Sequence, residues 1–155
     1  MRGSTRGSER AVGARNGINL QLQLLSQVDL FSACSKKELR RIAALATAVE
    51  VKEGRVLTRE GRPGSELFCI RSGSAVVTLR SKELRVLYPG DSFGEMSLIS
   101  EGPRTATVTA QTPMDVYIIG APEFATLIED VPQIGLRILR VLSQRLRELE
   151  KSPVS

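Results

Sequence analysis

The sequence contains no histidine and no tryptophan, and only two of its 155 residues are cysteines. Histidine is the side chain used most often as a general base near neutral pH and the commonest metal ligand, so the usual parts of a hydrolytic or metal-dependent site are missing. Cys34 and Cys69 are far apart and lack the short spacing of a metal-binding pair. Cys69 lies in the apolar stretch ELFCI, where we interpret it as a small buried hydrophobe. We therefore expect no enzyme, no metal site, no disulfide and no resident cofactor.

Long apolar runs are also missing. No stretch approaches the roughly 18 apolar residues that a membrane-spanning helix needs. The first 17 residues contain arginines but no apolar segment after them, so they do not resemble a secretory signal. These two absences predict a cytoplasmic protein, or the cytosolic part of a larger membrane protein.

Positive charge is concentrated at the start of the chain. The formal net charge is +5, and the first 20 residues carry +3 of it through four arginines and one glutamate. The remaining 135 residues carry only +2, which argues against an extended nucleic-acid-binding surface. Residues 1–19 are rich in Gly, Ser and Arg without periodicity, so we interpret them as a disordered basic tail. The alternative is a basic arm that contacts an acidic surface.

The rest of the chain, residues 20–152, has the length and composition of one soluble domain with its own core. LQLLSQVDLF (22–31) predicts a short helix that ends near a turn. Ser35 and Glu38 then have the spacing of a capping box, which predicts the start of a second helix. Cys34 and Leu39 are the expected hydrophobic staple of this helix. Its expected apolar face consists of Leu39, Ile42, Ala43 and Ala46.

From about residue 47 the apolar pattern changes to a period of two. Short β-branched segments alternate with glycine and proline turns, which is typical of an antiparallel sandwich or jelly roll. The expected strands are TAVEV, RVLTREG, SELFCIRSG, SAVVTLR, LRVLYPG, TATVTAQ and DVYIIG. We therefore predict a mainly β domain with flanking helices (α+β), its antiparallel β-roll covering about 47–120. Residues 93–103 interrupt the alternation.

Two helices are expected over about 121–150, starting at Pro122 and Pro132, because proline suits the first helical turn. The second helix carries two apolar stripes. Leu139, Leu142, Leu146 and Leu149 have coiled-coil spacing, and Ile134, Ile138 and Val141 lie beside them. Two readings remain open: the leucines meet a partner helix, or one broad face packs on the chain's own domain.

The segment FGEMSLISEGPRTATV (93–108), which contains this interruption, combines two glycines with two acids, Glu95 and Glu101, and one arginine among apolar residues. Gly90 and Gly94 permit a close approach of the backbone to a ligand, and a helical turn after Gly94 would present free N–H groups to an anion. The Arg104 guanidinium matches phosphate oxygens. Glu95 suits hydroxyl donors and would also steady the arginine. These residue types together indicate a sugar phosphate.

The same segment resembles the phosphate-binding cassette of the cyclic nucleotide-binding domain family, the β-roll type of the catabolite activator protein and the protein kinase A regulatory subunit. The resemblance extends over about residues 20–150, through LLSQVDLFSACSKKELRRIA and EGRPGSELFCIRSGSAVV. The matching cassette positions are Phe93, Gly94, Glu95, Leu98, Pro103, Arg104, Thr105 and Ala106, with Met96 and Ser97 as variants.

The resemblance implies a role for each part of the cassette. Arg104 would hold the equatorial phosphate oxygens, and Glu95, helped by the Gly94 backbone, would accept a hydrogen bond from the ribose 2′-OH. Backbone N–H groups near Ser97 and Thr105 would complete the phosphate cradle. Thr105 stands where a hydroxyl, in some members, contacts the base and favours cGMP or accepts either nucleotide, and threonine also occurs there in cAMP binders. The alternative for Thr105 is an ordinary strand residue.

The expected ligand-binding residues are Phe93, Gly94, Glu95, Met96, Ser97, Arg104, Thr105 and Ala106. Such domains cover the base with a cap from the C-terminal helix or beyond. The last helix has no aromatic residue, so an apolar lid is expected from among Leu136, Ile138, Leu139 and Leu142.

These features predict a cyclic nucleotide sensor, with cAMP favoured over cGMP as its ligand, that repositions its C-terminal helices. The alternative is a degenerate domain that serves as a protein-interaction or dimerisation module, or a regulatory fragment of a larger channel or transporter. A homodimer or an effector domain would meet the C-terminal helix. We expect no direct DNA binding, because no helix-turn-helix follows that helix before Ser155.

Overall fold

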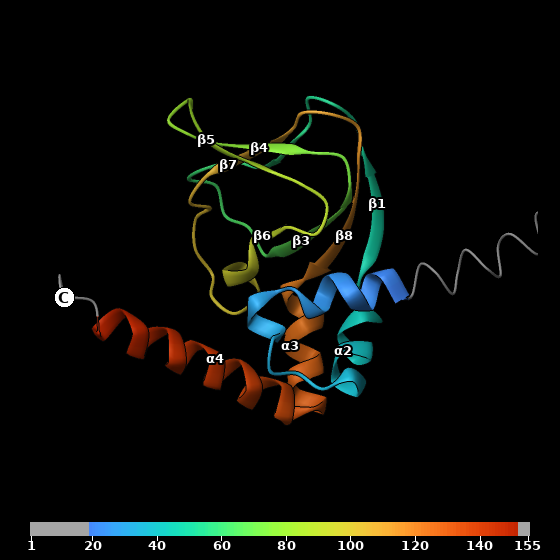
Figure 1. The fold of residues 1–155 in the computed structure, drawn as a ribbon, viewed down its shortest axis with the longest axis vertical. Coiled ribbons are helices and arrows are strands. Elements are labelled where there is room, and N and C mark those ends of the chain that lie inside the picture. Colours follow the sequence, from blue (N-terminus) through green and yellow to red (C-terminus); the bar gives the residue numbers. More distant parts are fainter. Residues whose placement is uncertain (1–18, 152–155) are drawn as a thin grey trace, which may run out of the picture.

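Near residue 47, where the apolar period changes, the chain passes from a layer of helices into a β-roll (Figure 1). The structure is a computed structural model that describes residues 19–151. The predicted tail, residues 1–19, lies outside the described residues except for Asn19, which belongs to a helix that ends at residue 26. None of the helices in the described range has the length and apolarity to cross a membrane.

The roll consists of two four-stranded antiparallel sheets, with strand orders β1-β8-β3-β6 and β2-β7-β4-β5. The strands are β1 (Thr47–Val51), β2 (Val56–Thr58), β3 (Glu66–Ser72), β4 (Ala75–Leu79), β5 (Lys82–Leu87), β6 (Ser92–Phe93), β7 (Thr107–Ala110) and β8 (Met114–Gly120). This arrangement confirms the predicted fold class.

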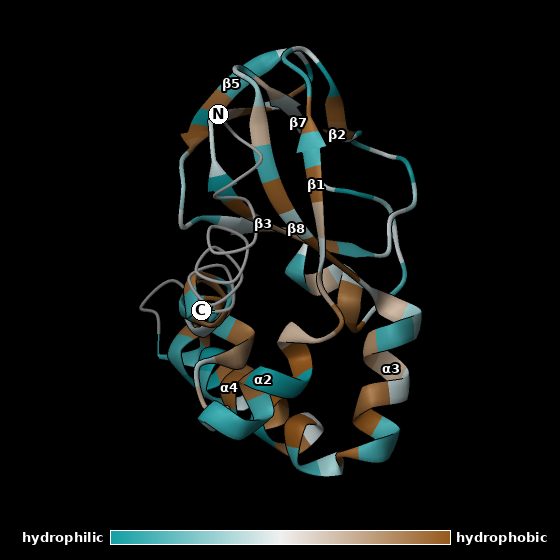
Figure 2. Cartoon of the chain, turned by 90° about the vertical axis from the view of Figure 1, so that its right-hand side faces the viewer, coloured by the Kyte–Doolittle hydropathy of each residue, from teal (hydrophilic) through white to brown (hydrophobic). Residues whose placement is uncertain are grey.

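The helical layer lies under one sheet of the roll (Figure 2). It contains η1 (Asp29–Phe31), α2 (Lys36–Ala43), α3 (Ala121–Asp130) and α4 (Pro132–Glu150), while η2 (Glu95–Leu98) is a short 3-10 turn in the cassette. The bounds of α3 and α4 agree with the two predicted C-terminal helices.

Strand β3 is buried on both of its faces. Leu67 and Cys69 face the helices, whereas Phe68 and Ile70 point into the core between the two sheets. Strand β8, its antiparallel partner, is divided in the same way. The sheet that contains them is therefore the wall shared by two apolar cores.

The predicted helix at 22–31 is wrong in its second half. The helix ends at residue 26, and a 3-10 turn at Asp29–Phe31 follows. Val28, Leu30 and Phe31 are all buried, and a continuous helix would spread these three positions around its axis. The tight turn lets all three reach one core.

The predicted capping box at the start of α2 is confirmed. The Ser35 hydroxyl accepts a hydrogen bond from the Glu38 N–H at 3.1 Å, and the Glu38 carboxylate accepts one from the Ser35 N–H at 2.7 Å. Leu39, Ile42 and Ala43 are buried on the expected face. Ala46 lies beyond the end of the helix but packs against the same core.

The two stripes of α4 have different environments. Ile134 and Ile138 are buried in the helical core, and Leu142 packs against it partly buried. The other leucines of the predicted seam, Leu139, Leu146 and Leu149, are 60–66% exposed. The isoleucine stripe is thus the side that α4 packs on its own domain, and a partner for the leucine stripe stays a prediction.

Candidate functional site

A cavity of about 780 Å³ opens between the cassette and the sheet that contains β4, β5 and β7. All eight residues that the sequence predicts for ligand binding line it. The cavity wall also includes residues from four strands and from the N-terminal segment: Thr58, Val77, Arg85, Leu87, Val108, Gln27 and Asp29. Its volume is in the range of small-molecule sites, roughly 300–1,000 Å³.

The backbone around Arg104 is fixed on both sides. The Arg104 N–H donates to the Arg62 carbonyl at 2.8 Å, and the Arg104 carbonyl accepts from the Gly61 N–H at 2.9 Å. An isolated antiparallel bridge joins Pro63 to Pro103 beside them. The arginine therefore stands on a loop that is held to the β2–β3 connection, not on a free segment.

Two glycines make room for the Arg104 side chain. A Cβ atom at Gly64 would collide with the guanidinium group. A Cβ atom at Gly94, which has φ of +81°, would lie 2.6 Å from Arg104 Nη1 and 2.6 Å from the Glu66 carbonyl oxygen. Position 94 thus requires a glycine for two reasons: the backbone is in the left-handed region, and the Arg104 side chain packs too closely to leave room for a Cβ atom.

Arg104 is nearly buried and only partly neutralised. Its Nη1 donates to the Glu66 carbonyl oxygen at 3.1 Å and to Ser97 Oγ at 2.9 Å. Its Nη2 lies 4.0 Å from the carboxylate of Glu66, a side chain that is 45% exposed. The guanidinium carbon lies 5.8 Å from the centroid of the Phe68 ring. Burial lowers the pKa of Arg104, and the nearby Glu66 raises it.

Burying a cation in this way is costly unless it is paired. Arg104 is 9% exposed, and its ion pair with Glu66 is at the limit of the distance for such a contact. Since Arg104 also lines the cavity, its own positive charge is balanced incompletely at this point of the wall. The arrangement is suited to an anion.

The structure does not pair Glu95 with Arg104, so the expectation that Glu95 steadies this arginine is wrong. Glu95 Oε1 instead accepts a hydrogen bond from Arg145 Nη2 of α4 at 3.3 Å. Burial raises the pKa of Glu95 above its ordinary value. Glu95 and Arg104 therefore remain separate, and each has its own partners.

The expected anion site at the start of a cassette helix is reduced in the structure. η2 has only four residues, and the Ser97 N–H already donates to the Gly94 carbonyl. A single turn has little macrodipole, because the effect sums over aligned peptide units. The positive charge beside η2 therefore comes from Arg104 and not from the turn itself.

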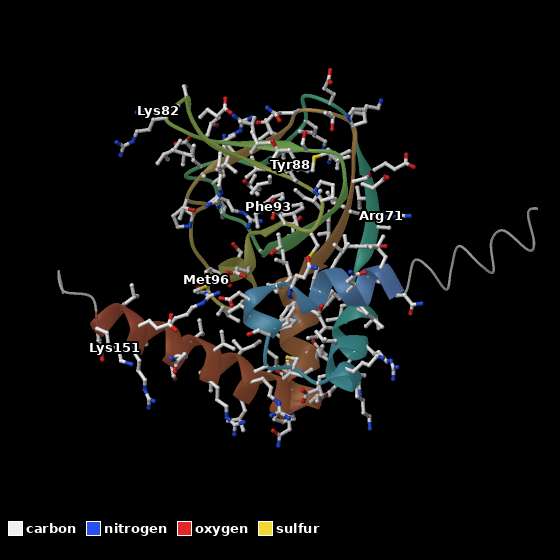
Figure 3. All side chains as sticks on the ribbon, in the orientation of Figure 1. Arg71, Lys82, Tyr88, Phe93, Met96 and Lys151 are labelled. Carbon is white, nitrogen blue, oxygen red and sulfur yellow. The ribbon has the colours of Figure 1, made fainter. Side chains whose placement is uncertain are left out.

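The remaining predicted residues differ in how they line the cavity. Phe93 stacks on Phe68, with ring centroids 4.8 Å apart, and belongs to the core between the sheets. Met96 belongs to η2, and its side chain is exposed (Figure 3). Thr105 is also exposed. The Ala106 carbonyl accepts a hydrogen bond from Thr58 Oγ1 at 3.1 Å, which ties the cassette to β2.

The predicted apolar lid is not formed. Ile138 is in the helical core, and Leu136, Leu139 and Leu142 are absent from the cavity wall. The cavity is lined instead by cassette, sheet and N-terminal residues. Within residues 19–151, no group of three His, Cys, Asp or Glu side chains is placed to hold a metal ion.

Sequence reasoning missed the supporting side chains. Gly64 approaches Arg104 from the β2–β3 connection and Glu66 from the start of β3, both about 40 residues earlier in the chain. Arg145 approaches Glu95 from 50 residues later. The proline–glycine pair at 63–64 was visible as a turn, but no local pattern links it to Arg104.

Comparison with known proteins places the chain in a family. The family model "Cyclic nucleotide-binding domain" matches residues 48–131, more than half of the sequence. The chain therefore belongs to the cyclic nucleotide-binding domain family, whose domains are regulatory.

Three relatives show how far the likeness extends. A CRP-like cAMP-activated global transcriptional regulator of Mycobacterium tuberculosis is 28% identical over 81% of this chain and 58% of its own length. A cGMP-dependent protein kinase of Eimeria tenella is 34% identical over 63% of this chain and 10% of its own length. The crystal structure of the N-terminal domain of a Streptomyces coelicolor transcriptional regulator superposes with a TM-score of 0.75 at 29% identity, covering 82% of this chain and 92% of that one.

Proposed function

We propose that this domain binds a 3′,5′-cyclic nucleotide in the cavity beside η2 and acts as a regulatory sensor. The observation that carries the proposal is Arg104, a nearly buried arginine on the cavity wall whose only carboxylate neighbour among the described residues lies 4.0 Å away. A cyclic phosphate would supply the missing negative charge, and a guanidinium group binds phosphate oxygens in a fixed geometry.

The second polar group of the site is Glu95. Its carboxylate lines the same cavity and accepts hydrogen bonds only, when ionised. A ribose hydroxyl is a suitable donor, so Glu95 would take the 2′-OH while Arg104 takes the phosphate. These two roles agree with the contacts in the structure, in which Arg104 donates to Ser97 whereas Glu95 accepts from Arg145.

We infer that cAMP is preferred over cGMP. The cAMP-activated relative aligns with 81% of this chain, whereas the cGMP-dependent kinase aligns with 63%. Thr105 is exposed at the cavity, where it can contact either base. The domain would carry no catalytic chemistry of its own, and it would act by shifting the position of α4 when ligand binds.

Calorimetric titration of the protein with cAMP, cGMP and adenosine tests this function. We expect binding of cAMP, weaker binding of cGMP, and no binding of adenosine, which lacks the phosphate. A protein that binds neither cyclic nucleotide would contradict the sensor function and favour the degenerate interaction module. Equal affinities for the two would contradict only the base preference.

A further inference from the structure

Arg145, on the second half of α4, contacts two carboxylates that line the cavity. Its Nη2 forms an ion pair with Asp29 of η1 and lies 3.3 Å from Oε1 of Glu95. These three residues come from three separate elements, and Arg145 joins them at the edge of the cavity.

The position of Arg145 along α4 gives this contact weight. The first half of α4 is held by the buried side chains of Ile134 and Ile138, whereas the leucines at its far end are exposed. In Figure 1 the second half of α4 extends past α3 toward the side of the molecule where η2 lies. Leu142 is the partly buried apolar contact of this half of α4, and the ion pairs of Arg145 with Asp29 and Glu95 tie the same half to the cavity wall.

Glu95 needs such a partner. The side chain of Glu95 is 26% exposed, and the desolvation of a carboxylate without a partner favours its neutral form. Arg145 engages Oε1, and within residues 19–151 Oε2 of Glu95 makes no hydrogen bond. An ionised carboxylate with one oxygen fixed by an arginine leaves its other oxygen to accept a hydrogen bond.

We propose that Arg145 is a positioning residue for the ligand's hydroxyl group: held by Asp29, it fixes the Glu95 carboxylate so that Oε2 accepts the ribose 2′-OH. The proposal rests on the proposed function and adds a residue of α4 to the site. Because one side chain serves both Glu95 and α4, recognition of the hydroxyl and placement of this helix are coupled, and each stabilises the other.

The test compares cAMP with 2′-deoxyadenosine 3′,5′-cyclic phosphate, which lacks only the 2′-OH. Calorimetry with both ligands is carried out on the parent, Arg145→Ala, Arg145→Lys and the control Arg147→Ala. Arg147 is exposed on the same helix. We expect Arg145→Ala to weaken cAMP binding about tenfold, because the hydrogen bond to a charged, positioned acceptor is lost. The deoxy ligand should bind the parent and Arg145→Ala with equal affinity. The affinity of Arg145→Lys for cAMP should lie between those of the parent and Arg145→Ala, and the affinity of Arg147→Ala should match that of the parent.

An equal loss for both ligands in Arg145→Ala would overturn the proposal, because it would show a general effect on the site. Unchanged cAMP binding would overturn it as well. The failure of the proposed function has a different result, namely a parent that binds neither cAMP nor cGMP. Alanine is favourable in a helix, and retained binding of the deoxy ligand verifies that the variant is folded.

Discussion

At the scale of single residues, the cavity is organised around Arg104. Its guanidinium group occupies space that Gly64 and Gly94 leave open, lies near the Phe68 ring and donates to Ser97. The sequence predicted Arg104 and Glu95 as the charged ends of a site, because each stands among apolar residues in a segment that resembles the phosphate-binding cassette. It could not identify their partners, because Glu66 and Arg145 are close to them only in the folded chain.

Replacement of Arg104 by alanine should remove most of the phosphate affinity. Loss of charge-assisted hydrogen bonds costs about 1.5–3 kcal/mol, and leaving a buried charge unpaired costs roughly 3–5 kcal/mol. We therefore expect cAMP affinity to fall about a hundredfold or more, measured by calorimetry. Arg71→Ala is the matched control, since Arg71 is an exposed arginine on β3 away from the cavity wall (Figure 3). Unchanged affinity in a folded Arg104→Ala variant would contradict the role of Arg104.

Gly64→Ala should act through Arg104. The new Cβ atom would collide with the guanidinium group, so we expect a loss of stability of about 1–3 kcal/mol from overpacking. The loss should be much smaller when Arg104→Ala is also present, because the colliding group is gone. Urea unfolding of the single and double variants measures this coupling. Gly102→Ala is the control, because no atom lies within 4 Å of its added Cβ, and additive effects at Gly64 and Arg104 would contradict the steric explanation.

At the scale of secondary-structure elements, local chemistry explains what could be predicted. The capping box at Ser35 and the prolines at 122 and 132 set helix starts, and the structure has them where expected. The strand TAVEV has the predicted bounds. The two-residue strand β6 was missed, because two residues show no alternation and only their pairing with β3 defines them. The turn at Asp29–Phe31 was missed because burial of its side chains overrides the helical pattern.

The start of α2 should be sensitive to Ser35 and to pH. Ser35→Ala removes an N-cap hydroxyl, which should cost about 0.5–2 kcal/mol of unfolding free energy. The Ser35 N–H that donates to Glu38 lowers the pKa of this carboxyl below its ordinary 4.5. The resulting stability is present above pH 4.5 and is lost as the pH falls through the folded-state pKa of Glu38.

Urea unfolding of the parent and of Glu38→Gln across this acidic range measures the pH effect. The unfolding free energy of the parent should fall more than that of Glu38→Gln, because only the parent has the carboxylate that becomes protonated. Ser32→Ala serves as the control for Ser35→Ala, because Ser32 is an exposed serine near the same turn. Equal stability of the two serine variants would contradict the capping contribution.

At the scale of the whole molecule, the sheet with β3 and β8 separates the cavity side from the helical side. One of its faces supplies Phe68 beneath Arg104, and the other supplies Leu67 and Cys69 to the helical core. Residues from both layers also meet at the cavity, since Asp29 lines it from η1. The sequence patterns predicted a roll and its flanking helices. An apolar run such as ELFCI does not by itself show that its alternate side chains belong to two different cores.

The double-sided burial of β3 has a consequence for hydrogen exchange. Neither core can open alone while β3 and β8 stay in place, so amides at 67–70 and 116–119 should exchange only through global unfolding. Amides at 143–150 belong to neither core and should exchange through a local opening of far lower free energy. Mass-spectrometric exchange of the free protein measures both classes, and one common rate would contradict the division. The molecule would then consist of one cooperative unit with a helical end that can detach from it, which is the mechanical requirement for a sensor that reports without unfolding.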